Sequence, residues 1–416
     1  MNLRREEIEL MAPVGSYESL MAAIQGGADS IYFGVEQLNM RAKSTNNFTT
    51  DDLQEIVKIC KDNNIKSYLV VNTIIYDHDV SIMKKLVDIA LASGLTAIIA
   101  SDQAVINYAS TKGVELHIST QVNISNIETL KFYAHFADVM VLARELSLKQ
   151  VAKITETIEK EQIAGPSGKL IRIEIFSHGA LCMAVSGKCY LSLHEQNSSA
   201  NRGACLQTCR KAYVVTEKET GYELEIDNEY IMSPKDLCTI GFVDKILNAG
   251  VKVLKIEGRA RPAEYVKTVC NCYNEAIDAC INDEYTVEKI KGWETRLATV
   301  FNRGFWDGYY LGRKIGEWSK DYGSKATKTK EYIGKGTNYF GKIKVAEFQI
   351  QSGNLKVGDE ILITGPTTGV VQTTIKEIRV DLKNTDEAFK GQTISIPIDE
   401  KVRRADKLYK IVDAKI

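Results

Sequence analysis

The stretch TAIIASDQAVINYASTKGVELHIST, residues 96–120, indicates the fold class of this chain. It opens with an apolar run rich in isoleucine (96–101) and continues with an amphipathic segment (102–113). A second run with β-branched residues (114–120) closes it. Two short runs of this kind around a helical segment are typical of two parallel strands joined by a helix. The stretch therefore predicts a β-α-β unit of an α/β fold.

The same unit recurs over the first 280 residues. We expect the other strands at 8–13, 30–35, 66–73, 138–144, 172–178 and 251–258. We expect the other helices at 16–27, 49–63, 79–94, 124–136, 147–160, 239–250 and 262–281. Eight strands, each followed by a helix, predict a (β/α)8 TIM-barrel-like domain. An open doubly wound sheet is the alternative, but no G-x-G-x-x-G motif follows a strand, which weakens its dinucleotide-binding version.

The chain has 416 residues, too many for one ordinary core, and its pattern changes near Asp321. Beyond that point apolar and polar residues alternate between glycine and proline turns, which predicts a small antiparallel β-barrel. We therefore expect a main domain at 1–320 and a second domain at 321–416. No apolar run has transmembrane length, and charges interrupt the amino-terminal segment, so a cytoplasmic protein with no membrane partner is expected.

Charge is balanced overall but uneven along the chain. The formal net charge is −1, which argues neither for nor against nucleic acid. Residues 311–344 hold nine Lys/Arg against three acids, and residues 401–416 hold six against two. Aromatic residues are interleaved in the first of these stretches. This pattern suits RNA binding, although a solvated linker and an ordinary strand surface explain it equally well.

A cysteine-rich insertion follows the seventh expected strand, at about 179–240. It contains Cys182, Cys189, Cys205 and Cys209, and the motif SPKDLC adds Cys238. The insertion leaves the carboxyl end of a strand, the end at which barrels of this class carry their active sites. A structural zinc site, a disulfide framework and an iron–sulfur cluster are the candidate explanations. Zinc usually needs closer Cys pairs, and disulfides need an oxidising compartment. A cluster tolerates wide spacing if the fold gathers the thiols.

The motifs HGALCMAVSGKC, NRGACLQTCR and SPKDLC, with ELMAPVGSYESLMAAIQGGADSIYFG near the amino terminus, closely resemble the U32 peptidase family. The resemblance covers most of the chain. Several branches of this family are iron–sulfur proteins of oxygen-independent hydroxylation. The resemblance implies a 4Fe–4S cluster held by Cys182, Cys189, Cys205 and Cys238. Cys209 is an alternative ligand.

The carboxy-terminal segment LKVGDEILITGPTTG resembles the second domain of elongation factors. By length and domain content the chain resembles the branch that hydroxylates the tRNA wobble uridine to 5-hydroxyuridine. This resemblance implies a tRNA-modification enzyme with prephenate as co-substrate and tRNA as RNA-binding partner. It also allows a related partner chain or a homo-oligomer. The alternatives are a U32-type peptidase or collagenase, and a non-enzymatic RNA-binding or redox accessory scaffold.

The peptidase alternative has little support from motifs. No H-E-x-x-H zinc motif and no G-x-S-x-G nucleophile motif is present, and HEQNS at 194–198 lacks the second histidine. A Cys–His pair remains possible, but a thiolate bound to iron is no longer a free nucleophile.

Candidate site residues follow from the dianionic co-substrate and from the expected strand ends. A dicarboxylate calls for arginines, because a guanidinium binds a carboxylate through two hydrogen bonds. We expect catalytic roles for Arg144, Arg259 and His178. We expect substrate-binding roles for Arg41, Asn72, Gln121, Arg202 and Arg261. Surface ion pairs explain the arginines equally simply, and His178 could instead cap a loop.

Overall fold

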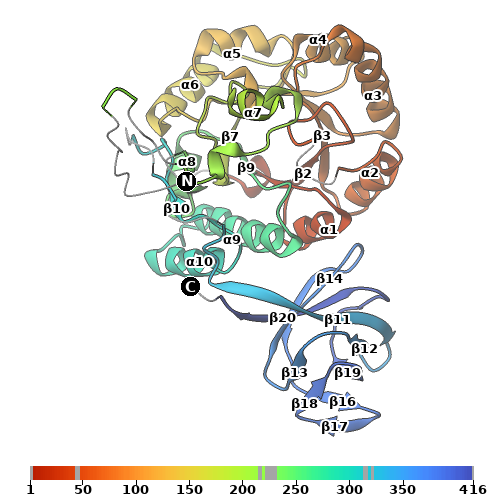
Figure 1. Cartoon of the computed structure of the whole chain (residues 1–416). Coiled ribbons are helices and arrows are strands. Elements are labelled where there is room, and N and C mark those ends of the chain that lie inside the picture. The colour runs from red at the N-terminus through yellow and green to blue at the C-terminus, as the bar shows by residue number, and fades with distance from the viewer. Residues whose placement is uncertain are drawn as a thin grey trace.

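The computed structural model describes residues 3–42, 47–213, 218–220, 232–312, 317–319 and 323–414. Its first domain is a closed barrel of eight parallel strands (Figure 1). The strands are β1 (Glu9–Pro13), β2 (Ser30–Phe33), β3 (Lys66–Val71), β4 (Ala97–Ala100), β5 (Leu116–Ile118), β6 (Val139–Val141), β7 (Arg172–Gly179) and β9 (Val253–Ile256). Strand β9 pairs with both β7 and β1, which closes the ring. The predicted (β/α)8 barrel is confirmed.

The eight predicted helices surround the barrel. They are α1 (Tyr17–Gln25), α2 (Asp52–Asp62), α3 (Val80–Ser93), α4 (Gln103–Thr111), α5 (Ile127–Ala134), α6 (Leu148–Glu161), α8 (Val243–Asn248) and α9 (Ala263–Ile281). Several begin at a polar cap: the side chains of Ser16, Asp102, Asn126 and Ser147 each accept a hydrogen bond from the first turn. Helix α8 is shorter than the predicted 239–250. An additional helix, α10 (Val287–Ala298), packs against α9.

Two short strands extend the barrel sheet beyond the sequence-based expectation. Strand β8 (Asp236–Cys238) pairs antiparallel with the end of β7, and β10 (Phe305–Trp306) pairs with β8. The cysteine-rich insertion lies between β7 and β8. Its described part contains α7 (Leu191–Gln196) and two single-turn 3₁₀ helices, Ala200–Arg202 and Thr208–Arg210.

The second domain is antiparallel, as expected. Its strands are β11 (Lys328–Phe340), β12 (Val345–Ile350), β13 (Asn354–Lys356), β14 (Glu360–Gly365), β15 (Gly369–Thr374), β16 (Ile378–Val380), β17 (Lys383–Thr385), β18 (Glu387–Phe389), β19 (Thr393–Pro397) and β20 (Lys407–Asp413). Eight of them form one sheet in the order β15-β14-β20-β11-β12-β19-β16-β17, and β13 pairs with β18. Both sheets contribute to one apolar core. The predicted domain boundary at 320–321 lies outside the described residues.

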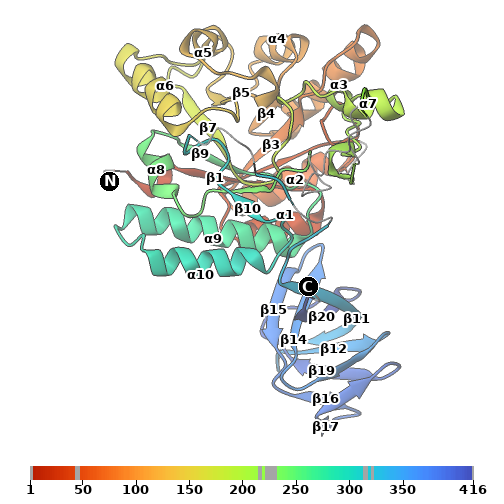
Figure 2. The same ribbon diagram turned by 60° about the vertical axis from the view of Figure 1, so that its left-hand side comes forward.

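The second domain lies beside α1 and α9 on the outer side of the barrel (Figure 2). Gln25 in α1 hydrogen-bonds to Thr368 O and Val370 N, both at 2.9 Å. Lys267 in α9 donates to Val370 O at 2.7 Å. These contacts attach the turn between β14 and β15 to the helical ring. No described helix is long and apolar enough to span a bilayer.

Candidate functional site

A pocket of about 200 Å³ opens at the carboxyl ends of the barrel strands. Side chains from several strands and from the insertion line it together, as is usual for the catalytic face of this fold. The lining residues from the barrel include Tyr32, Arg41, Asn72, Gln121, Arg144, Phe176, Lys255, Glu257, Arg259 and Arg261. The insertion contributes Cys182, Cys189, Cys205, Cys209 and Arg210. The structure therefore brings most of the predicted site residues to one place.

Four thiols share the wall of this pocket. Cys182 is exposed, whereas Cys189, Cys205 and Cys209 are partly buried. Burial, and then the neighbouring Cys182 and Cys205, raise the pKa of Cys189. Burial raises the pKa of Cys209 to about 11. Within the described part of the chain, no three His, Cys, Asp or Glu side chains converge closely enough to hold a single metal ion. A four-iron cluster makes a different demand, because each iron binds its own thiolate.

Cys238 lies apart from these four thiols. It ends β8, opposite His178 on β7, and does not line the pocket. Burial raises its pKa to about 12, with Tyr273 as a neighbour. Of the two candidates for the fourth ligand, Cys209 lines the pocket and Cys238 does not.

Arg202 attaches the insertion to the barrel, and Arg210 joins the two ends of the insertion to each other. Arg202 donates to Ile74 O at 2.6 Å, pairs with Asp79, and stacks over Tyr76 at 4.2 Å. Arg210 donates to Leu181 O and Pro234 O, both at 2.7 Å. Arg202, for which a substrate-binding role was predicted, pairs with Asp79 and is not among the residues that line the pocket.

His178 does not reach the pocket either. Strands β7 and β9 pair Phe176 with Lys255 and then His178 with Ile256, so the register shifts by one residue. Such a bulge turns the following side chain to the opposite face. His178 is 1% exposed and packs against the rings of Tyr265 and Tyr273. Burial and the charge of Arg261 lower its pKa to about 3. The structure thus places His178, for which a catalytic role was predicted, among buried aromatic rings and not in the lining of the pocket.

The pocket arginines differ in how many of their guanidinium donors are already bound to other protein groups. Arg41 pairs with Glu257 at 3.1 Å. Arg144 stacks over Phe176 at 3.9 Å, and its Nε atom is buried without a hydrogen-bond acceptor among the described residues. The Nη1 atom of Arg259 likewise lacks an acceptor among them. Burial lowers the pKa of Arg259 to about 10, although Tyr32 and Glu257 oppose this effect. Arg144 and Arg259 therefore keep donors for an anion.

A small amide and hydroxyl cluster lies at the ends of β3 and β5. The Asn72 amide donates to Ser119 Oγ at 3.1 Å and to Gln121 Oε1 at 3.0 Å. Asn72 Oδ1 accepts from the backbone N–H of Met40 at 3.2 Å. Asn72 and Gln121 both line the pocket, as predicted. Their mutual hydrogen bonds fix the orientation of two groups that can recognise a polar ligand.

Two pocket residues were not predicted from the sequence: Lys255 on β9 and Glu257 directly after it. Both line the pocket, because alternate residues of a strand face the same side. Lys255 is 5% exposed and pairs with Glu174 at 2.7 Å. Burial raises the pKa of Glu257, but Arg41, Arg144 and Arg259 together hold it below its usual value. The signal was present in VKVLKIEG, where Lys255 and Glu257 are separated by one residue at the carboxyl end of an apolar run.

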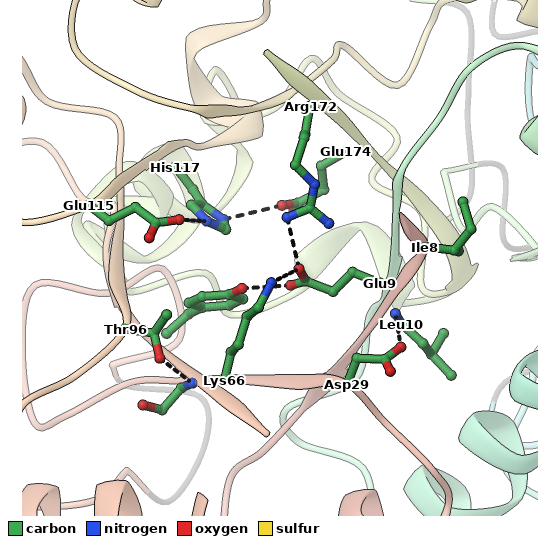
Figure 3. Close-up of polar contacts among 12 residues, drawn as sticks. Ile8, Glu9, Leu10, Asp29, Lys66, Thr96, Glu115, His117, Arg172 and Glu174 are labelled. Atoms are coloured by element: carbon green, nitrogen blue, oxygen red, sulfur yellow. Dashed lines mark hydrogen bonds and ion pairs between the residues drawn. The ribbon is translucent and has the colours of Figure 1, made fainter. Parts of the chain in front are cut away.

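Charged side chains continue through the barrel below the pocket (Figure 3). Glu9 pairs with Lys66 at 2.7 Å and with Arg172 at 3.0 Å, and Tyr68 donates to it at 2.6 Å. Burial opposes ionisation of Glu9, but Arg172 and Lys66 prevail and lower its pKa to about 2.

His117 connects this region to the pocket floor. It is fully buried and lies 3.6 Å from Glu115 on one side and 3.6 Å from Glu174 on the other (Figure 3). Both distances are too long for hydrogen bonds. Burial lowers the pKa of His117, but the two carboxylates outweigh this effect and raise it. The interior of the barrel is thus partly polar, and Lys255, which pairs with Glu174, also lines the pocket.

Comparisons with known proteins identify relatives of this chain. Residues 15–320 match the sequence model of peptidase family U32. A protein named collagenase from Porphyromonas gingivalis strain W83 is 62% identical over 97% of this chain and 98% of its own length. The tRNA hydroxylation protein P1 of Bacillus subtilis strain 168 is 30% identical over 97% of this chain and 94% of its own. The 23S rRNA 5-hydroxycytidine C2501 synthase of Escherichia coli K12 is 30% identical over 76% of this chain and 47% of its own.

Proposed function

The chain belongs to peptidase family U32, and from this premise we propose that it hydroxylates RNA without oxygen. The specific reaction that we propose is conversion of the tRNA wobble uridine to 5-hydroxyuridine, with prephenate as co-substrate and a 4Fe–4S cluster as cofactor. Relatives at 30% identity that are named for tRNA and rRNA hydroxylation support an RNA substrate.

One observation carries this proposal: thiols and arginines with unused donors line the same pocket. A buried guanidinium donor without an acceptor is unfavourable unless a ligand supplies one. Arg144 and Arg259 offer two such donors, and prephenate carries two carboxylates. We propose that these two arginines bind the co-substrate, and that the positive charge of Lys255 at the pocket floor adds to the attraction.

The donor set of the insertion fits an iron–sulfur cluster. Cys182, Cys189 and Cys205 would supply three thiolates, and Cys209 or Cys238 the fourth. Arg41 is an electrostatic neighbour of Cys205, so it can balance negative charge that builds up on the thiolate side. When bound, such a cluster supplies one-electron chemistry at the pocket wall, which amino-acid side chains alone do not provide.

The remaining pocket residues suit a nucleobase. The fixed amides of Asn72 and Gln121 can hydrogen-bond to the polar edge of a uracil. The base would have to leave its stack to enter, which costs little for the unpaired bases of an anticodon loop. The second domain would hold another part of the tRNA: Tyr332 and Phe340 on β11 are 40% and 42% exposed.

Nucleoside analysis of tRNA tests the reaction. Cells that lack this protein should lose 5-hydroxyuridine, and the wild-type gene should restore it. The Arg144→Gln and Arg259→Gln variants should fail to restore it while accumulating as folded protein. Unchanged 5-hydroxyuridine in cells that lack the protein would refute the proposal.

Peptidase activity is the second candidate, because relatives at 62% and 56% identity are named collagenase. A gelatin-cleavage assay on protein purified without oxygen tests it. Cleavage that persists in a Cys182→Ala/Cys205→Ala double variant would favour a peptidase whose activity does not depend on these thiols.

A further inference from the structure

A second groove opens beside the pocket and is strongly basic. Among the described residues that line it are four cations and no carboxylate: Arg210, Lys211, Arg261 and Arg303. Gln207, Arg210 and Arg261 line both this groove and the pocket, so the two cavities are neighbours that share a wall. We refer to the four cations and the space between them as the basic groove.

Arg261 stands at the junction of the two cavities and is prepared for an anion. Its guanidinium stacks over the ring of Phe301 at 3.5 Å. This contact fixes the plane of the guanidinium and leaves its in-plane N–H donors free for hydrogen bonding. Burial lowers the pKa of Arg261, and the negative charge of Asp236 offsets only part of this effect.

The other cations of the basic groove are held in place but only partly neutralised. Arg303 lies 3.3 Å from Asp236 and 5.1 Å from the Phe301 ring. Arg210 is held by neutral acceptors, the Leu181 and Pro234 carbonyls among them. Mutual repulsion among fixed cations is relieved when an anion binds between them.

Lys211 marks the open end of the basic groove. Its side chain is 54% exposed and lies 3.7 Å from Glu195, a separation at which a solvent-exposed pair contributes little. The basic groove thus has one cation at a solvent-exposed position, Lys211, and one, Arg261, that also lines the pocket.

We propose that the basic groove binds a backbone phosphate of the RNA whose base enters the pocket. This inference rests on the proposed function, because it assigns a contact to the same substrate. A base that is turned out of its stack stays joined to its sugar and phosphates, so phosphate contacts have to lie directly beside the base pocket. The basic groove meets this requirement through Arg261, and its charge suits a polyanion.

RNA binding by the full chain tests the proposal. The probe is a labelled RNA hairpin with a uridine at the wobble position of an anticodon loop, and fluorescence anisotropy reports binding between about 50 and 200 mM salt. The variants are Lys211→Gln and Arg303→Gln. Lys160→Gln is the matched control, because Lys160 lies in the last turn of α6, at the opposite end of the barrel. Since Arg303 faces the buried Asp236, circular dichroism has to show that its variant is folded. Lys211→Gln, at an exposed position, provides an independent result.

We expect each groove variant to bind roughly three- to tenfold more weakly than the wild type, with a salt slope about 0.7 smaller for each lost phosphate contact. The Lys160→Gln variant should match the wild type. If the wild type binds the hairpin and both groove variants bind equally well at every salt concentration, the basic groove is not the phosphate site and the proposed function still stands. If the wild type binds no RNA but binds a gelatin peptide, both the basic-groove assignment and the proposed function fail.

Discussion

The Nζ atom of Lys255 lies 2.7 Å from Glu174 Oε1, and neither side chain is more than 6% exposed. This ion pair joins β9 to β7 at the floor of the pocket. It also connects the ligand-binding end of the barrel to His117 and the charged residues below. Interiors of such barrels are usually filled by branched apolar side chains, so a charged pair inside the barrel is unusual. Its energetic cost and its effect on neighbouring charges lead to the first two predictions.

Replacing Lys255 by methionine should destabilise the protein strongly. The substitution leaves the Glu174 carboxylate buried without its closest counter-charge, which costs on the order of 3 kcal/mol. The double variant Lys255→Met/Glu174→Gln should recover part of this loss, because both charges are then absent. Urea denaturation of the single and double variants measures the effect. Strictly additive losses would show that the two charges do not interact.

His117 should make stability depend on pH. Glu115 directly before its own strand, Glu174 on β7 and Glu9 on β1 face it, together with the Tyr68 ring on β3. Because the folded state raises its pKa, protonated His117 stabilises the fold fully below the unfolded value near 6.5. This stabilisation should disappear as the pH rises through the raised folded pKa.

The matched variant for this prediction is His117→Gln, which removes the titrating group. Unfolding free energies measured from pH 6 to pH 9 should fall more steeply for the wild type than for the variant. The contributions of the other titrating groups are common to both proteins and cancel in the difference. Parallel curves would contradict a raised pKa for His117. Glu9 serves as an internal contrast, because its lowered pKa affects stability only in acid.

Gly34 should be required for anion binding. A Cβ atom at this position would lie 2.5 Å from Arg259 Nη1 and 2.6 Å from Asn39 Cγ, so Gly34→Ala has to displace the arginine. We expect prephenate to bind roughly tenfold more weakly, as judged by isothermal titration calorimetry, because a charge-assisted contact is lost. Gly292→Ala is the control, since nothing lies within 4 Å of its added Cβ. Equal prephenate affinities for the two variants would show that Arg259 does not contribute to binding.

The barrel was predictable because each strand is a short, buried, β-branched run and each helix repeats its apolar residues at helical spacing. Helix α10 was missed although Trp293 and Leu297 follow the same spacing and are buried. The short strands β8 and β10 have two or three residues each, too few to show any period.

The site was predictable only where position along a strand determines it. Asn72, Gln121, Arg144 and Arg259 follow strand ends, and the closed barrel brings strand ends together. His178 also follows this rule, but a one-residue register shift turns it away, and no local pattern in RIEIFSHG indicates the shift. Arg202 pairs with Asp79, 123 residues away in the sequence, and such a long-range contact has no sequence signature.

The measurement that tests the account most directly is the iron and sulfide content, with the visible spectrum, of protein purified without oxygen. The account predicts a brown protein with about four irons per chain, and a Cys205→Ala variant that loses both colour and iron. Of Cys209→Ala and Cys238→Ala, the one that loses its cluster identifies the fourth ligand. Colourless wild-type protein with stoichiometric zinc, or with no metal, would contradict the redox role of the thiols. Such a result would favour the peptidase and scaffold alternatives.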